Sequence, residues 1–166
     1  GAGRPVTLFG GLAGDNLRMV ETRVASSSDV LTDGLVGLVL DGARIETQGL
    51  ATSGWQPVGV EKTVTRSEGN VVFELDGESV LDVYGDTFGI EGLRDPEASI
   101  VMDIGVQFPL SIRRDDGTSV IRAPLFPAPG TGGLVFAGGV PEGSRVRFCV
   151  PPSLDIVERV VAQASA

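Results

Sequence analysis

The stretch GVEKTVTRSEGNVVFEL, residues 59–75, decides the fold class of this 166-residue chain. Two arms rich in β-branched residues flank the turn signal Ser67-Glu68-Gly69-Asn70. Glycine supplies the positive φ that a tight turn requires, and asparagine tolerates it. The stretch therefore predicts an antiparallel hairpin, because parallel strands need a much longer connection.

Working outward, the same logic predicts three more antiparallel pairs: residues 35–40 with 44–47 across Asp41-Gly42-Ala43, residues 109–113 with 119–122, and residues 134–136 with 145–150. Short strands are also expected at 6–9 and 20–24. The proline- and glycine-rich segment 123–133 is expected to be a boundary or an ordered loop, since proline lacks an N–H donor.

Helix signals are few. Residues 79–88 carry apolar side chains at helical spacing, and Ser79 with Asp82 resembles a capping box. A C-terminal helix is expected to begin at Ser153 and to carry one apolar stripe, formed by Leu154, Val157, Val160 and Val161. These patterns predict an α+β, β-rich protein with mainly antiparallel sheets, hairpins, a short middle helix and a C-terminal helix.

Composition limits the classes of partner. Hydrophobic residues make up 42% of the chain, which is typical of a folded globule. Thirteen basic against 22 acidic residues give a net charge of −9, and no basic run is present. Neither nucleic acid nor a membrane is expected to bind, because both require clustered positive charge or a long apolar segment.

Catalytic and metal chemistry are also restricted. The chain has no histidine, so Ser-His-Asp and Cys-His sites and the usual zinc sites are excluded. The one cysteine, Cys149, lies in an apolar run and is expected to be buried. No pair of acids stands in a recognisable catalytic frame, so neither an enzyme, a cofactor nor a metal is predicted.

Three glycine-anchored signatures occur in order: GGLAGD at 10–15, GWQPVG at 54–59 and VTRSEGN at 64–70. They are followed by ELDG at 74–77 and by the middle helix signal. Together these motifs resemble the FIST family, best over 8–84 and less continuously over 108–143. The resemblance implies that 1–95 is the second half of a FIST N-terminal region and 96–166 the start of a FIST C-terminal region. It also implies that the sequence, which does not begin with Met, is a piece of a longer chain.

Within this resemblance the first glycine loop is a candidate ligand-binding element. Backbone amides near Gly11 and Gly14 could line a pocket, and Asp15 could accept hydrogen bonds from an ammonium group. The alternative is that the loop only forms a turn. Nucleotide binding is not expected, because the loop lacks the lysine of a phosphate-binding loop.

Four more residues are candidates. Arg122 ends a predicted strand, where it could clamp a carboxylate with two hydrogen bonds or simply pair with a surface acid. Trp55 could lie over a pocket or plug the end of a sheet. Asn70 and Tyr84 complete the predicted ligand-binding set, although Asn70 also suits its turn and Tyr84 a core position.

The resemblance implies an intracellular, cytoplasmic sensory module from a bacterium. It would bind a small ligand, such as an amino acid, and pass a signal to an attached or partner output domain, with a homodimer as an expected assembly. The alternative is a non-catalytic protein-interaction or dimerisation module of a signalling assembly. Arginine is strongly preferred over lysine, with Lys62 the single lysine, which also fits a bacterial source of high genomic GC content.

Overall fold

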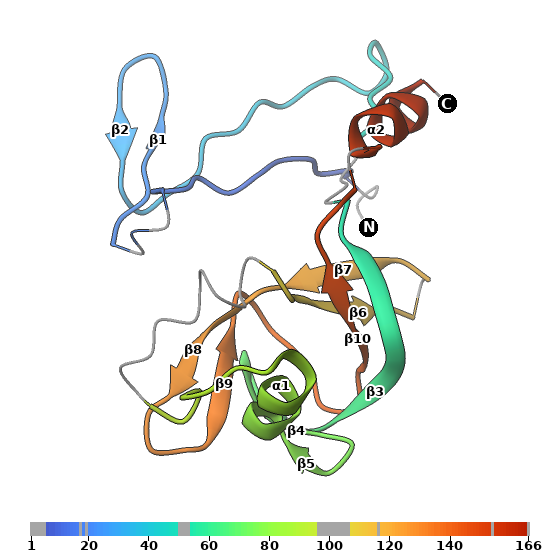
Figure 1. The fold of residues 1–166 in the computed structure, drawn as a ribbon. Coiled ribbons are helices and arrows are strands. Elements are labelled where there is room, and N and C mark those ends of the chain that lie inside the picture. Colours follow the sequence, from blue (N-terminus) through green and yellow to red (C-terminus); the bar gives the residue numbers. More distant parts are fainter. Residues whose placement is uncertain are drawn as a thin grey trace, which may run out of the picture. The chain divides into compact units, whose positions relative to one another are not determined.

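The computed structural model describes residues 6–16, 18, 20–49, 54–95, 107–115, 117–153 and 155–165. The chain divides into two compact units, Gly1–Ala51 and Thr52–Ala166, and each is described by itself. The architecture is α+β and β-rich, as the sequence predicts, with two helices and mostly antiparallel strands among the described residues (Figure 1).

The described part of the second unit contains one eight-stranded sheet, whose strands pair antiparallel in the order β7-β6-β10-β3-β4-β9-β8, with β5 paired to β4. The strands are β3 (Gln56–Glu68), β4 (Val71–Leu75), β5 (Glu78–Ser79), β6 (Leu110–Arg113), β7 (Ser119–Arg122), β8 (Pro124–Ala128), β9 (Gly133–Phe136) and β10 (Arg145–Val150).

This sheet curls, because its two outermost strands are consecutive in the chain. Only Ala123 separates β7 from β8, although β7 pairs with β6 and β8 pairs with β9. The Ala123 carbonyl accepts a hydrogen bond from the Ala137 N–H at 2.8 Å. The opposite ends of the strand order therefore meet along residues 119–128, a path that can be followed in Figure 1.

The core lies between the curled sheet and helix α1 (Val80–Phe88), which packs against β4 and β9. Aromatic rings fill its centre: the Tyr84 ring meets Phe148 edge-on at 5.0 Å between centroids. Among the described residues, the largest fully buried side chains are Tyr84, Phe136, Leu75, Leu110, Leu134, Val64, Val72, Val80, Val140, Val146 and Pro109.

Both predicted helices form, with corrections at their starts. Helix α1 follows Ser79 as expected, but the Ser79 side chain makes no capping hydrogen bond, so the predicted capping box is wrong. Helix α2 (Ile156–Ala164) has Asp155 as its N-cap instead of Ser153. Leu154, part of the predicted apolar stripe, lies outside the described residues. The stripe members Val157 and Val161 stay 67% and 59% exposed.

Two of the predicted hairpins are confirmed, β3–β4 and β6–β7. In the first turn Gly69 takes the positive φ (59°), whereas Asn70 does not. The predicted pairing of 134–136 with 145–150 is wrong, because β9 pairs with β4 and β8 while β10 pairs with β3 and β6.

The segment 137–144 explains that wrong pairing. It crosses the β3–β4 hairpin, where the Val140 N–H donates to the Gly69 carbonyl (3.0 Å) and the Gly143 N–H donates to the Val64 carbonyl (2.8 Å). Residues 123–133, expected to be a boundary or loop, instead begin with strand β8. Among the described strands, β8 lies at an end of the order and pairs only with β9, a position where prolines are tolerated.

In the described part of the first unit the regular structure is one short pair, β1 (Val24–Ala25) with β2 (Val30–Leu31). The strands expected at 6–9 and 35–40 are wrong, and only the last residue of the one expected at 20–24 is in a strand. The turn at Asp41 does form, with the Arg44 N–H donating to the Asp41 carbonyl at 2.9 Å. Its predicted arms do not pair: their apolar side chains remain exposed, so no burial stabilises a sheet there.

Candidate functional site

A half-open cavity of about 960 Å³ lies at the tip of the β6–β7 hairpin in the second unit. The hairpin forms one wall and the segment that enters β10 forms the other. Its volume lies in the range of small-molecule sites, roughly 300–1,000 Å³. The lining residues are Ile112, Arg113, Arg114, Asp115, Gly117, Val120, Arg122, Gly139, Pro141, Glu142, Gly143, Ser144 and Arg145.

Arginines are the most frequent charged residues in the described lining of the cavity. Among the residues that the structure describes, four arginines line it, Arg113, Arg114, Arg122 and Arg145, together with two carboxylates, Asp115 and Glu142. One Glu142 carboxylate oxygen also accepts the Ser67 N–H at 3.4 Å. Because the chain as a whole carries a charge of −9, this local excess of guanidinium groups favours an anionic ligand.

Arg122, the last residue of β7, is held in place by backbone carbonyls. Its Nε donates to the Gly139 carbonyl (3.1 Å) and its Nη1 to the Ile121 carbonyl (3.0 Å). A guanidinium carries five N–H donors, so these bonds leave several N–H groups able to bind an anion. Arg122 can therefore present a fixed positive charge and spare donors to the cavity.

Gly138 makes room for this arginine. A Cβ at Gly138 would lie 2.9 Å from Arg122 Nε and 3.2 Å from its Cζ. The Gly138 φ of 115° is also one that side-chain-bearing residues rarely adopt. The backbone at position 138 therefore favours glycine, and a side chain there would force the guanidinium that lies against it to shift.

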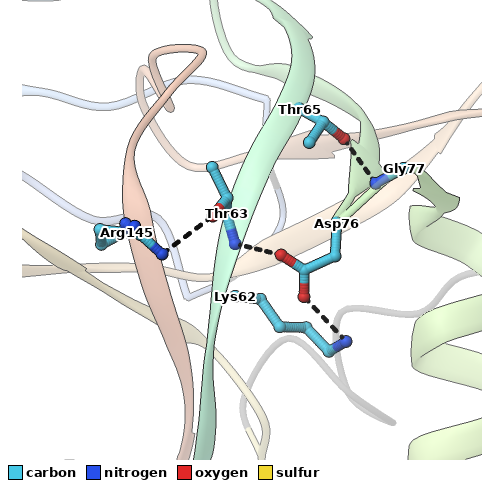
Figure 2. Close-up of polar contacts among 6 residues, drawn as sticks. All are labelled: Lys62, Thr63, Thr65, Asp76, Gly77 and Arg145. Atoms are coloured by element: carbon cyan, nitrogen blue, oxygen red, sulfur yellow. Dashed lines mark hydrogen bonds and ion pairs between the residues drawn. The ribbon is translucent and has the colours of Figure 1, made fainter.

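Arg145, on the other wall, is tied to β3 by the polar network in Figure 2. Its Nη1 donates to Thr63 Oγ1 at 3.1 Å, and the Thr63 N–H donates to Asp76 Oδ1 at 2.8 Å. Lys62 Nζ contacts the other Asp76 oxygen at 3.3 Å. One aspartate thus anchors the strand that positions Arg145.

The Asp76-Gly77 turn explains how the aspartate reaches β3. Asp76 has φ 54° and Gly77 φ 83°, the left-handed pair of a tight hairpin between β4 and β5. The Gly77 N–H donates to Thr65 Oγ1 at 2.9 Å. The hydrogen bond from the Thr63 amide, aided by the charge of Lys62, lowers the pKa of Asp76 below its ordinary value, against a smaller opposing effect of burial.

Of the predicted ligand-binding residues in the second unit, Arg122 lines the cavity and three others do not. Tyr84 is fully buried, and its hydroxyl donates to the Phe108 carbonyl at 3.2 Å. Asn70 donates through Nδ2 to the Phe136 carbonyl at 3.0 Å, which joins the β3–β4 turn to β9. Trp55 is half-buried just before β3.

The remaining candidates belong to the first unit and are no part of this cavity. Gly11 and Gly14 are exposed, and Asp15 is half-buried. Asp15 Oδ2 accepts the N–H groups of Val20 (2.8 Å) and Glu21 (3.3 Å), so its carboxylate shapes its own loop. A ligand role for these three residues stays a prediction.

Sequence reasoning missed Arg113, Arg114 and Arg145. The adjacent pair Arg113-Arg114 at the hairpin turn was the available signal. The sequence carried no such signal for Arg145, because the cavity forms only where residues 137–144 return beside the β6–β7 hairpin. Separately, no cluster of side chains able to hold a metal is found among the described residues. Within the same residues, none of the helices has the length and apolar character needed to cross a membrane.

Two family models match the chain: the FIST N domain over residues 1–78 and the FIST C domain over residues 81–166. The uncharacterized protein Rv0628c of Mycobacterium tuberculosis is 32% identical over 152 residues, covering 87% of this chain and 38% of that protein. The uncharacterized protein Mb0898c of Mycobacterium bovis is 30% identical over 147 residues, covering 86% and 37%. The chain thus spans well under half the length of these relatives. No solved structure matches.

Proposed function

Because this chain belongs to the FIST family, whose domains are signalling-associated sensory domains, we propose that it binds a small carboxylate ligand, such as an amino acid, in the arginine-lined cavity. The proposal rests on the position of Arg122. This arginine is the one predicted ligand-binding residue that lines the cavity, and carbonyl hydrogen bonds hold its guanidinium with donors to spare. A guanidinium fixed in this way binds a carboxylate at little entropic cost.

The same hydrogen bonds suggest how ligand binding would change the conformation of the rest of the unit. Arg122 connects β7 to the Gly138-Gly139 segment, and that segment crosses the β3–β4 hairpin. A ligand bound to the remaining N–H groups of this guanidinium would change the strength of these carbonyl contacts and so shift the population of segment conformations. We propose that an attached or partner output domain reads this shift, that the module acts in the bacterial cytoplasm, and that it is not an enzyme.

Calorimetric titration with single amino acids and small monocarboxylates tests the proposal. We expect at least one of them to bind and to raise the melting temperature, since a ligand at a hundred times its dissociation constant adds about 2.7 kcal/mol of stability. Arg122→Gln should remove the binding. Arg147→Gln is the matched control, because Arg147 is exposed on β10 and does not line the cavity. Binding that survives Arg122→Gln would refute the assignment of the site.

The alternative function, dimerisation without a ligand, is favoured by one specific observation. Apolar side chains of the first unit are largely exposed, including Leu12 at 102%, Val39 at 95% and Leu8 at 86%. Exposed apolar groups of this size commonly mark an interaction surface. Light scattering across a range of protein concentrations would then show a dimer, and Leu12→Asp with Val39→Asp should shift it toward the monomer. A constant monomer mass would exclude this alternative.

A further inference from the structure

Strand register shows which side chains accompany Arg122 on its face of the sheet. Across the β6–β7 pair Arg122 lies opposite Leu110, and residues opposite each other on antiparallel strands share a face. Val120, two residues earlier on the same strand, lies opposite Ile112. Leu110 and Ile112 belong to the core and are only 0% and 5% exposed. Arg122 is therefore on the inner face of the curled sheet, where the core borders the cavity.

This face offers one charge and an apolar surface. Side chains alternate along a strand, so Arg113, the neighbour of Ile112, belongs to the opposite face. Among the described residues that β6 and β7 place on the inner face, Arg122 alone is charged. A single fixed guanidinium matches a ligand with one carboxylate.

The apolar surface lies directly beside the guanidinium. The hydrogen bond from Arg122 Nη1 to the Ile121 carbonyl keeps the guanidinium close to the β7 backbone that carries Val120. Val120 is partly buried against the core, and both it and Ile112 line the cavity, with Pro141 on the other wall. A carboxylate held by Arg122 thus has an apolar part of the cavity wall next to it.

This apolar part discriminates between ligand side chains. A polar group placed against Val120 and Ile112 would lose its hydrogen bonds to water and gain none from these side chains. An aliphatic chain instead gains about fourfold in affinity for each methylene that it buries. The inner face therefore favours a carboxylate whose remaining atoms are aliphatic.

We propose that the cavity selects a monocarboxylate with a small aliphatic chain, either an amino acid such as leucine or the same carbon chain without the amino group. The carboxylate binds Arg122, and the chain lies against Val120 and Ile112. This inference rests on the proposed function and narrows its ligand class.

Calorimetric titration with five probes tests it: leucine, isocaproate, alanine, asparagine and aspartate. Isocaproate is leucine without its amino group, whereas asparagine and aspartate share the heavy-atom skeleton of leucine and differ in polarity and charge. We expect leucine or isocaproate to bind at least tenfold more tightly than the other three, because only these two bury a branched aliphatic chain. Tighter binding of leucine identifies an amino-acid site, and equal or tighter binding of isocaproate identifies a carboxylic-acid site.

Variants separate the aliphatic contact from the anion contact. Val120→Thr keeps the branched shape but adds a hydroxyl to the apolar part, so it should weaken the tighter of leucine and isocaproate about tenfold and leave alanine unchanged. Arg122→Gln should weaken every probe that binds. Val135→Thr is the matched control and should weaken none, because Val135 is half-buried on β9 and does not line the cavity.

Two results would overturn this inference and leave the proposed function standing. One is alanine, asparagine or aspartate binding as tightly as leucine and isocaproate. The other is a Val120→Thr variant whose affinity for the tighter of those two is unaltered. The absence of binding by all five probes and by the remaining amino acids, in a chain shown to be folded by its melting transition, would overturn both.

Discussion

Replacing Asp76 tests how the polar network of Figure 2 stabilises the second unit. Asp76→Asn keeps a residue that tolerates a φ of 54°, and it leaves an oxygen that can accept the Thr63 N–H. It removes the negative charge, and with it the ion pair to Lys62. The variant therefore isolates the electrostatic part of the network from its backbone geometry.

The expected loss follows from these contacts. A hydrogen bond to a charged group contributes about 1.5–3 kcal/mol, against 0.5–1.5 kcal/mol for a neutral one. An exposed ion pair adds about 0.2–1 kcal/mol. Because the Asp76 side chain is 43% exposed, water reduces both contributions. We expect Asp76→Asn to cost about 1 kcal/mol, and Asp76→Ala to cost about 2–4 kcal/mol because alanine adds left-handed strain.

The pH dependence gives the sharper measurement. The pKa of Asp76 is lowered in the folded state, so its stabilisation is complete above the ordinary value of 3.8 and is lost as the pH falls through the folded value. Denaturant titrations of the wild type and Asp76→Asn should differ fully at pH 6; the difference should begin to shrink below about pH 4 and close only once the pH has fallen through the lowered folded value. A difference that stays the same at pH 6 and pH 3.5, or is absent at pH 6, would refute the reasoning.

Three further predictions concern the core and the cavity wall. Tyr84→Phe removes the bond to the Phe108 carbonyl, so we expect about 1 kcal/mol less stability by denaturant titration and a melting point lower by roughly 4 °C; an unchanged midpoint would contradict that bond. Burial raises the pKa of the Cys149 thiol to about 11. At pH 8 a thiol reagent should therefore label Cys149 only after denaturation, and rapid labelling of the native chain would contradict its burial. Gly138→Ala should cost about 1–3 kcal/mol and should weaken anion binding by displacing Arg122. Gly130→Ala is the control for backbone strain alone, because Gly130 also has a positive φ but has open space around it and does not line the cavity; equal binding by both variants would show that Gly138 does not position the arginine.

Local signals in the sequence predicted the parts of the fold that short stretches determine. Gly69 alone was enough to predict the β3–β4 turn. A polar turn between two arms of alternating residues was enough to predict the β6–β7 hairpin. Helix α1 followed from apolar spacing and ends at Gly89, which adopts a φ of 66°. In each case the partner of a residue lies within about fifteen positions along the chain.

Long-range pairing escaped prediction because it depends on which surfaces meet in three dimensions. The partner of β3 on its other side is β10, more than seventy residues later, and no periodicity specifies that choice. The same limit applies to the candidate site. Arg122 could be singled out at a strand end, but Arg145 lines the cavity only because 137–144 returns across the hairpin.

The curled sheet has a consequence for how the family itself is divided. The FIST N match ends at residue 78 and the FIST C match begins at residue 81, yet β3 and β4 of the first pair with β10 and β9 of the second. Residues 79–80 join strand β5 directly to helix α1. A cut at this border would separate hydrogen-bonded neighbours and leave two open strand edges. In this chain, the part of the FIST N match from residue 52 onward and the FIST C match therefore form one compact unit, and neither part should be expressed or interpreted without the other.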